Sequence, residues 1–131
     1  MYRRLFTLLF IVLLASCSSK QVRLTDPAFQ PQISNQTDTF AFQVTNLTGV
    51  TQTLSYSWQN TGTRGDVNQA SQITSGSATL TILDAAGQQV YTSSLASNGT
   101  FTTATGTSGN WTIRISANNV KGSLNFRVQR P

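Results

Sequence analysis

A regular alternation of apolar and polar residues runs through most of the chain from residue 39 onward. Successive side chains of a β-strand point to opposite faces of the sheet, so this repeat of two predicts strands with one buried face. We expect the apolar set to form the core: Phe40, Phe42 and Val44; Leu54, Tyr56 and Trp58; Ala78, Leu80 and Ile82; Trp111, Ile113, Ile115 and Ala117; Leu124, Phe126 and Val128.

Segments rich in Asn, Asp and Gly separate these runs. Residues 46–49, Asn-Leu-Thr-Gly, predict a turn that joins the first two runs as a hairpin, and residues 118–122 predict a turn between the last two. Asp84 opens and Gly87 closes another turn. The spacing of the runs, about 8–12 residues, predicts an all-β fold, an antiparallel β-sandwich of about 7–8 strands.

Two segments have a weaker pattern. The polar stretch after the loop over 60–65 predicts one irregular strand around residues 70–73. In the returning strand over 88–95, Val90 and Tyr91 lie on opposite faces, which indicates a bulge or a position at the edge of a sheet.

The first 16 residues have the pattern of a secretory leader. Arg3 and Arg4 precede an apolar run over 5–14 that Thr7 alone interrupts, as in a helical signal peptide. A membrane-spanning helix needs about 20 apolar residues, and the polar sequence that begins at Ser16 cannot extend the run. We therefore expect the leader to be cleaved rather than kept as an anchor.

The end of this leader, Leu14-Ala15-Ser16-Cys17, resembles the lipobox of bacterial lipoproteins. The resemblance implies cleavage between Ser16 and Cys17, diacylglyceration of the Cys17 thiol and acylation of the new amino group. Each buried methylene contributes about 0.8 kcal/mol, so two or three acyl chains hold a protein on a bilayer almost permanently. The alternative is an ordinary cleaved signal with a cysteine nearby by chance.

The resemblance also bears on location. In Gram-negative lipoproteins an Asp after the acylated cysteine commonly signals retention in the inner membrane, and this chain has Ser18 there. We expect a cell-envelope protein, anchored by lipid to the outer membrane and facing the periplasm or the cell surface. In a Gram-positive host it would lie on the outer face of the single membrane.

These features predict three parts of the chain. Residues 1–16 are the signal peptide, residues 17–36 are the lipidated Cys17 and a flexible tether that contains Pro27 and Pro31, and residues 37–131 are the β-sandwich domain. Val22 and Leu24 could form an edge strand within the tether instead.

The composition excludes most catalytic chemistry. The chain has no His and no Glu, and its one Cys is assigned to the lipid, so nucleophilic triads and most general-base designs lack their groups. The four acids, Asp26, Asp38, Asp66 and Asp84, are best interpreted as dispersed turn caps, and zinc and copper sites have no ligands. We expect no enzyme activity, no metal site and no cofactor apart from the covalent lipid. A calcium site on Asp84 is a remote alternative.

Tyr91 and Phe101 are the candidate ligand contacts, because aromatic rings can stack on sugars. The strand parity does not decide whether these two side chains point into the core or out of it. Trp58 and Trp111, in contrast, follow the inward parity of the core. Arg114 and Arg127 are expected on the outward face of neighbouring strands, but the basic residues are too sparse for nucleic-acid binding. The tripeptide Arg64-Gly65-Asp66 matches an integrin-recognition motif in an expected exposed loop, and a chance match is the better interpretation.

The segment over 77–128, with its Asp-x-x-Gly turn and Gly-x-Trp strand opening, resembles the carboxyl-terminal half of small extracellular jelly-roll or immunoglobulin-like sandwiches, including the pre-peptidase C-terminal type. This resemblance implies a fold rather than a task. We expect a non-catalytic protein-interaction or accessory module of the cell envelope, with glycan binding through the uncharged polar surface as the alternative.

Overall fold

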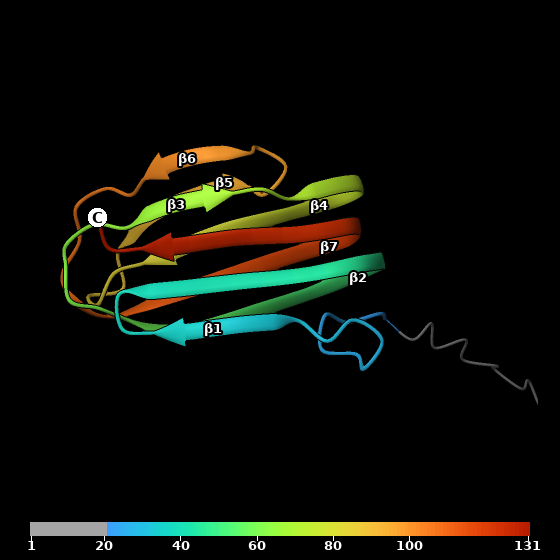
Figure 1. Cartoon of the computed structure of the whole chain (residues 1–131), viewed down its shortest axis with the longest axis horizontal. Helices are drawn as coiled ribbons and strands as arrows, with labels where there is room; N and C mark the ends of the chain where they lie inside the picture. The colour runs from blue at the N-terminus through green and yellow to red at the C-terminus, as the bar shows by residue number, and fades with distance from the viewer. Residues whose placement is uncertain (1–20) are drawn as a thin grey trace, which may run out of the picture.

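The computed structural model describes residues 21–131. This part of the chain contains seven strands and no helix: β1 (Gln32–Gln36), β2 (Thr39–Asn60), β3 (Asp66–Gln69), β4 (Gln72–Leu83), β5 (Gln89–Ser94), β6 (Gly99–Thr102) and β7 (Gly109–Gln129). All strand pairs are antiparallel (Figure 1), so the prediction of an all-β antiparallel sandwich is confirmed. A search of the described residues finds no helix long and apolar enough to cross a membrane.

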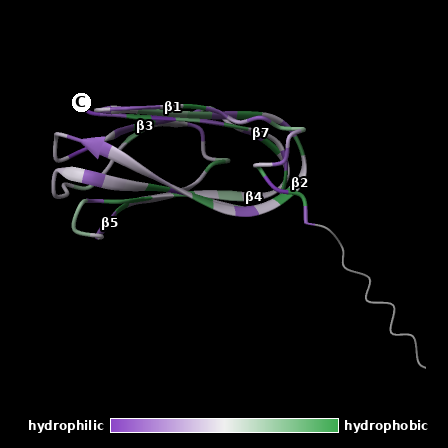
Figure 2. Ribbon diagram, turned by 90° about the horizontal axis from the view of Figure 1, so that it is seen from below, coloured by the Kyte–Doolittle hydropathy of each residue, from purple (hydrophilic) through white to green (hydrophobic). Residues whose placement is uncertain are grey.

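Strands β2 and β7 form a long ribbon that contributes to both layers of the sandwich. Thr39 pairs with Gln129 at one end of this ribbon and Asn60 pairs with Gly109 at the other, so the two strands remain paired along nearly their full lengths. Figure 2 shows the ribbon passing from one layer to the other at its bend. One layer therefore contains the first half of β2 and the second half of β7, and the other layer contains the remaining halves.

The bend lies where the backbone of three strands adopts left-handed conformations. The residues with positive φ are Asn46 (58°) and Gly49 (102°) in β2, Gly76 (72°) in β4, and Asn119 (48°) and Gly122 (113°) in β7. The β2–β7 ladder shifts register at the same place. The predicted hairpin turns over 46–49 and 118–122 are thus wrong, because the chain continues in the same strand on both sides. Asn and Gly supply the same positive φ to a bulged bend as to a turn.

The remaining strands extend each layer from the ribbon. The front layer, in the order β1-β2-β7-β3-β6, places β1 beside the first half of β2 and β3 beside the end of β7. The back layer has the order β2-β7-β4-β5, because β4 pairs with the first half of β7 and β5 pairs with β4. The edges are β1 and β6 in the front layer, and β5 and the second half of β2 in the back layer.

The core lies between the two layers and is formed by the side chains that the alternation predicted. All members of the predicted apolar set are buried except Leu54 and Tyr56, which are half-buried and pack against the core. Trp58 and Trp111 are fully buried opposite one another, with their rings 5.9 Å apart and nearly perpendicular. The indole nitrogens donate to the carbonyl oxygens of Gln36 (3.1 Å) and Thr107 (2.8 Å), so neither polar group is left unpaired.

The folded part begins earlier than the predicted boundary at residue 37. Leu24 is fully buried, Val22 forms a bridge with Val50, and β1 occupies the end of the segment expected to be a tether. Val22 forms an isolated bridge and no strand, so the edge strand expected as the alternative at Val22 and Leu24 is absent, although both residues contact the domain. Burying a leucine side chain contributes about 1.5–3 kcal/mol, which offsets the backbone entropy lost by ordering about two residues. Residues 17–20 lie outside the described part.

The two segments with a weaker sequence pattern, around residues 70–73 and 88–95, form parts of strands β3, β4 and β5. Strand β3 covers residues 66–69 and β4 begins at Gln72, so the single irregular strand expected around 70–73 is replaced by the end of one strand and the start of another. The Asp84–Gly87 turn is present, with the Gly87 N–H bonded to the Asp84 carbonyl. Strand β5 is an edge, and the β4–β5 ladder has a bulge after Ile82, as the parity of Val90 and Tyr91 indicated.

Candidate functional site

The outer face of the front layer carries rows of polar side chains that cross its strands. Directly paired residues of antiparallel strands project to the same face, so the register defines the rows. The first row is Gln36, Thr39, Gln129, Asp66 and Thr102; the second is Ser34, Ala41, Arg127, Asn68 and Thr100; the third is Gln32, Gln43 and Asn125. Ala41 is the one apolar residue among them.

Two hollows on this face adjoin one another. A hollow of about 450 Å³ is lined by Asp66, Asn68, Thr100, Asn125, Arg127 and Gln129 over β7, β3 and β6. A second, of about 360 Å³, lies toward β1 and β2, and it is lined by polar and apolar residues: Gln32, Ile33, Ser34, Ala41, Phe42, Gln43, Asn125, Phe126 and Arg127. Because Asn125 and Arg127 line both hollows, they form one continuous depression across the front layer. We call it the polar trough.

The hydrogen-bonding groups of the polar trough are only partly used within the protein. The hydroxyl of Thr102 donates to the Asp66 carboxylate (3.0 Å), and the amide of Asn68 donates to the Thr100 hydroxyl (3.0 Å). Within residues 21–131 the ion pair is Arg130–Asp38, so Arg127 and Asp66 are not paired. The side chains of Asn125, Arg127 and Gln129 make no hydrogen bond to other described residues. Their donors and acceptors are free for a ligand.

The polar trough was not predicted from the sequence, and the neighbours of one of its residues were predicted wrongly. Arg127 was expected to share an outward face with Arg114 on a neighbouring strand. Both residues lie on β7, but Arg114 is on the half of the strand that belongs to the back layer, in a row with Ser55 and Thr81. The outward parity of residues 125, 127 and 129 was visible in the sequence. Their juxtaposition with β3 was not, because it depends on long-range pairing.

The structure brings the two candidate ligand contacts, Tyr91 and Phe101, together. Their ring centroids are 6.3 Å apart, where the edge strands β5 and β6 face each other. Phe101 pairs with Val67 and Tyr91 pairs with Ile82, both fully buried, so the two rings are on the inner side of the layers rather than in the polar trough.

The polar end of Tyr91 is already bonded. Burial raises the pKa of the Tyr91 hydroxyl, which donates to the side-chain oxygen of Gln69 (2.7 Å). Phe101 is 36% exposed. The contact of this pair with a ligand stays a prediction, and the ring with solvent access is that of Phe101.

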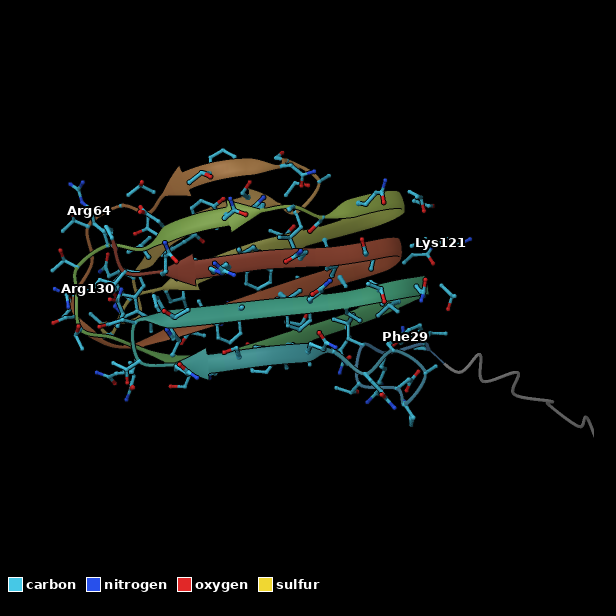
Figure 3. All side chains as sticks on the ribbon, in the orientation of Figure 1. Phe29, Arg64, Lys121 and Arg130 are labelled. Atoms are coloured by element: carbon cyan, nitrogen blue, oxygen red, sulfur yellow. The ribbon has the colours of Figure 1, made fainter. Side chains whose placement is uncertain are left out.

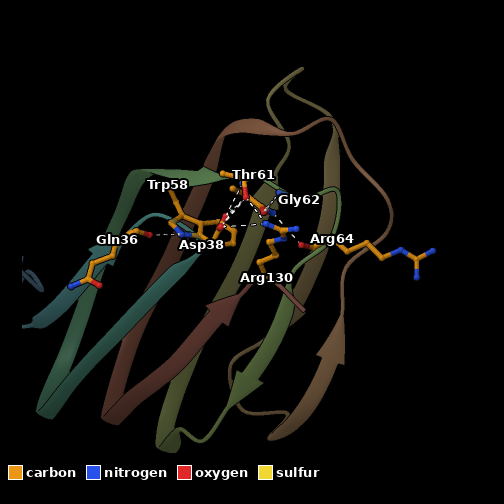
Figure 4. Close-up of polar contacts among 8 residues, drawn as sticks. Gln36, Asp38, Trp58, Thr61, Gly62, Arg64 and Arg130 are labelled. Carbon is orange, nitrogen blue, oxygen red and sulfur yellow. Dashed lines mark hydrogen bonds and ion pairs between the residues drawn. The ribbon is translucent and has the colours of Figure 1, made fainter.

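The two ends of the sandwich differ. Arg64 and Arg130 lie at the end that carries the loops, whereas Phe29 and Lys121 lie at the bent end (Figure 3). At the loop end, Asp38 accepts hydrogen bonds from the backbone N–H (2.7 Å) and hydroxyl (2.8 Å) of Thr61, and the Arg130 guanidinium lies 3.6 Å away (Figure 4). These contacts lower the pKa of Asp38 below its ordinary value.

A second carboxylate, Asp84, holds two loops together. It accepts hydrogen bonds from the backbone N–H groups of Thr107 (2.8 Å), Gln88 (2.8 Å) and Ala86 (3.0 Å), which lower its pKa. Like Asp38, it is therefore used as a cap, as the sequence indicated. Among the described residues no three His, Cys, Asp or Glu side chains come close enough to hold a metal ion.

The tripeptide Arg64-Gly65-Asp66 does not form a protruding loop tip. Gly65 is buried, and its N–H is bonded to the hydroxyl of Thr103. Asp66 begins β3 and lines the polar trough, while the exposed Arg64 donates from Nε to the hydroxyl of Thr105. The two charged residues of the motif therefore belong to different surfaces.

Comparison with models of known protein families and with curated proteins finds no match to this chain. The lipobox residues Ser16 and Cys17 lie outside the described residues, so their roles stay predictions. Functional inference therefore depends on the sequence of the leader and on the chemistry of the surfaces described above.

Proposed function

We propose that the chain is a lipid-anchored protein of the cell envelope whose sandwich is a non-catalytic interaction or accessory module. The observation that carries this proposal is the early start of the folded part. Val22 already contacts the sandwich, five residues after Cys17. A chain of five residues reaches at most about 18 Å, so an acylated Cys17 would keep the domain close to the bilayer.

The surfaces support binding rather than catalysis. Asp38 and Asp84 are engaged as caps in separate loops, and the chain has no His or Glu to act as a general base. The bent end, where the described part of the chain begins, would face the membrane, and the loop end would face away (Figure 1). An outer-membrane location follows from Ser18 by the resemblance to lipoproteins.

The test is labelling and cross-linking in cells. The tagged full-length chain is expected to incorporate a palmitate analogue, to fractionate with the outer membrane, and to co-purify with a defined envelope protein after cross-linking. The Cys17→Ala variant is expected to lose the label, the membrane fraction and the partner. Labelling that survives in Cys17→Ala would refute the anchor, and a lipidated protein that enriches no protein neighbour would refute the accessory role.

A second candidate function, glycan binding, is favoured by one observation: the polar trough with its unpaired Arg127, Asn125 and Gln129. Protein interfaces normally have an apolar centre with aromatic residues. In the described part, the large apolar side chains that are exposed are Ile33 and Phe101, which lie on different edges. The exposed apolar residue that lines the polar trough, Ile33, lies at its edge on β1, so an amide-rich depression of this kind suits a hydroxyl-rich ligand better.

A further inference from the structure

We propose that the polar trough binds an uncharged polysaccharide, with the glycan lying across the strands of the front layer and Arg127 at the centre of the contact. The inference deepens the second candidate function and names its site. It differs from the sequence-based prediction, which placed ligand contact at Tyr91 and Phe101.

The shape of the polar trough fits an extended chain. Neighbouring strands lie about 4.8 Å apart, so a depression that crosses five strands is about 19 Å long. Its two hollows are continuous through Asn125 and Arg127, and both are open to solvent along the outer face. A linear polymer can enter such a depression at any point along its length, and no chain end is required.

The charge of the polar trough fits a neutral ligand. The two charged side chains that line it are Asp66 and Arg127, which cancel. An anionic polymer would place negative groups beside Asp66, and a cationic polymer would place positive groups beside Arg127. A neutral ligand with hydroxyl groups can instead donate to the carboxylate and accept from the guanidinium, because each hydroxyl is both donor and acceptor.

The hydrogen-bonding groups of the polar trough also suit the closely spaced hydroxyls of a glycan in number and position. Asn125 and Gln129 flank Arg127 on the same outward face of β7, two residues away on either side. Each amide offers two donor hydrogens and one acceptor oxygen, and the guanidinium presents a planar set of donors that can contact neighbouring hydroxyls. The described contacts leave these three side chains unbonded, so a glycan displaces water without breaking a protein hydrogen bond.

The aromatic residues that line the polar trough, Phe42 and Phe126, are buried, so no exposed ring of the described residues is available in the trough for stacking on a sugar. Tyr91 and Phe101 lie on the inner side of the layers, and the outward rows consist of amides, hydroxyls, one alanine and the two charged residues. Recognition would therefore depend on hydrogen bonds rather than on stacking. Removing one charged donor should weaken binding about tenfold, the effect of losing one charge-assisted hydrogen bond.

The chain supplies a matched control. Arg127→Gln and Arg114→Gln both remove one positive charge from the same strand, β7, but Arg114 lies on the outer face of the back layer. The detergent-solubilised full chain is run in native gels that contain dextran, mannan, mixed-linkage β-glucan or the anionic polymer polygalacturonate. Circular dichroism of each variant verifies the fold.

At least one neutral polymer is expected to retard the protein, with an apparent Kd that rises about tenfold in Arg127→Gln and stays unchanged in Arg114→Gln. Three outcomes overturn the proposal: no retardation by any neutral polymer, equal weakening in the two variants, or retardation by polygalacturonate alone. Should Arg127→Gln not fold, Gln129→Ala takes its place, with a smaller expected loss of roughly threefold, because its amide makes neutral hydrogen bonds. Because Cys17→Ala is expected to bind equally well in this assay, failure of the anchor and failure of the glycan site are distinguished.

Discussion

Replacing Gly122 with alanine is expected to destabilise the domain much more than replacing Gly87, although both glycines have positive φ. Gly122 (φ 113°) lies in the bend of β7, where a Cβ atom would overlap the backbone carbonyl oxygen of Gln72. Gly87 (φ 80°) lies in the turn before β5, and a Cβ atom there would meet nothing within 4 Å. Comparing the two alanine variants therefore separates the free energy lost to the positive φ from the free energy lost to crowding in the bend.

The magnitudes follow from these two environments. The left-handed backbone costs an alanine roughly 1–2 kcal/mol, and the smaller entropy of the unfolded variant offsets about 0.4–1 kcal/mol of that, so Gly87→Ala should lose about 1 kcal/mol. Gly122→Ala adds overpacking of about 1–3 kcal/mol and a weakened hydrogen bond to β4 of about 1 kcal/mol. The free energy of unfolding should therefore fall by about 3–5 kcal/mol in Gly122→Ala.

The assay is equilibrium unfolding in guanidinium chloride, followed by tryptophan fluorescence. The chain has two tryptophans, Trp58 and Trp111, and both are buried in the core, so their emission reports the loss of packing between the layers. If the two alanine variants lose the same free energy to within about 0.5 kcal/mol, the bend tolerates the displacement and the reasoning is refuted.

Three further predictions concern the core, the caps and the aromatic pair. Trp111→Phe should lower the free energy of unfolding by about 1–3 kcal/mol, because it replaces a buried indole with a smaller ring and removes the hydrogen bond to Thr107. An unchanged thermal midpoint would contradict the expected loss of stability. The pKa of Asp84 is lowered in the folded state, so its carboxylate stabilises the fold above its ordinary pKa of 3.8, and this contribution disappears as the pH falls through the lower, folded-state pKa. The thermal midpoint of Asp84→Asn should therefore decline less steeply below pH 3.8 than that of the unchanged protein, and an identical decline in the two would contradict the role of Asp84. Tyr91→Phe should cost about 1 kcal/mol through the lost bond to Gln69 while it leaves the near-ultraviolet circular dichroism largely intact, and a large spectral change would show that the hydroxyl positions the ring.

The faces of the strands could be predicted from the sequence, but their connections could not. The alternation through Phe40, Phe42 and Val44 and through Leu124, Phe126 and Val128 depends only on the local repeat, and the structure buries all six. The hairpin around Asn46 was wrong because the sequence signal for positive φ is the same in a turn and in a bend.

The candidate site could be predicted from the sequence to a smaller extent than the fold, because it too depends on strand pairing. Residue type alone identifies Tyr91 and Phe101, and the structure brings them together, but their inward orientation follows from the pairing of β5 with β4 and of β6 with β3. The polar trough joins Asp66 to Arg127, which are far apart in the sequence and adjacent only because β3 pairs with the end of β7. An isolated Asn, Gln or Arg on an outward position looks the same whether it lines a depression or an open face.

The pairing of β2 with β7 also determines when the protein can fold. The ribbon joins the first long strand of the domain to the last, and β3 and β4 both need β7 as a partner. A chain whose ladders are closed mainly by distant segments pays the entropy of large loops before it gains contacts, so folding is expected in milliseconds to seconds rather than microseconds. A nascent or truncated chain that lacks β7 would keep only the separate pairs β1–β2, β3–β6 and β4–β5, with no strand to join them into layers, so the domain is expected to remain unfolded until β7 is available.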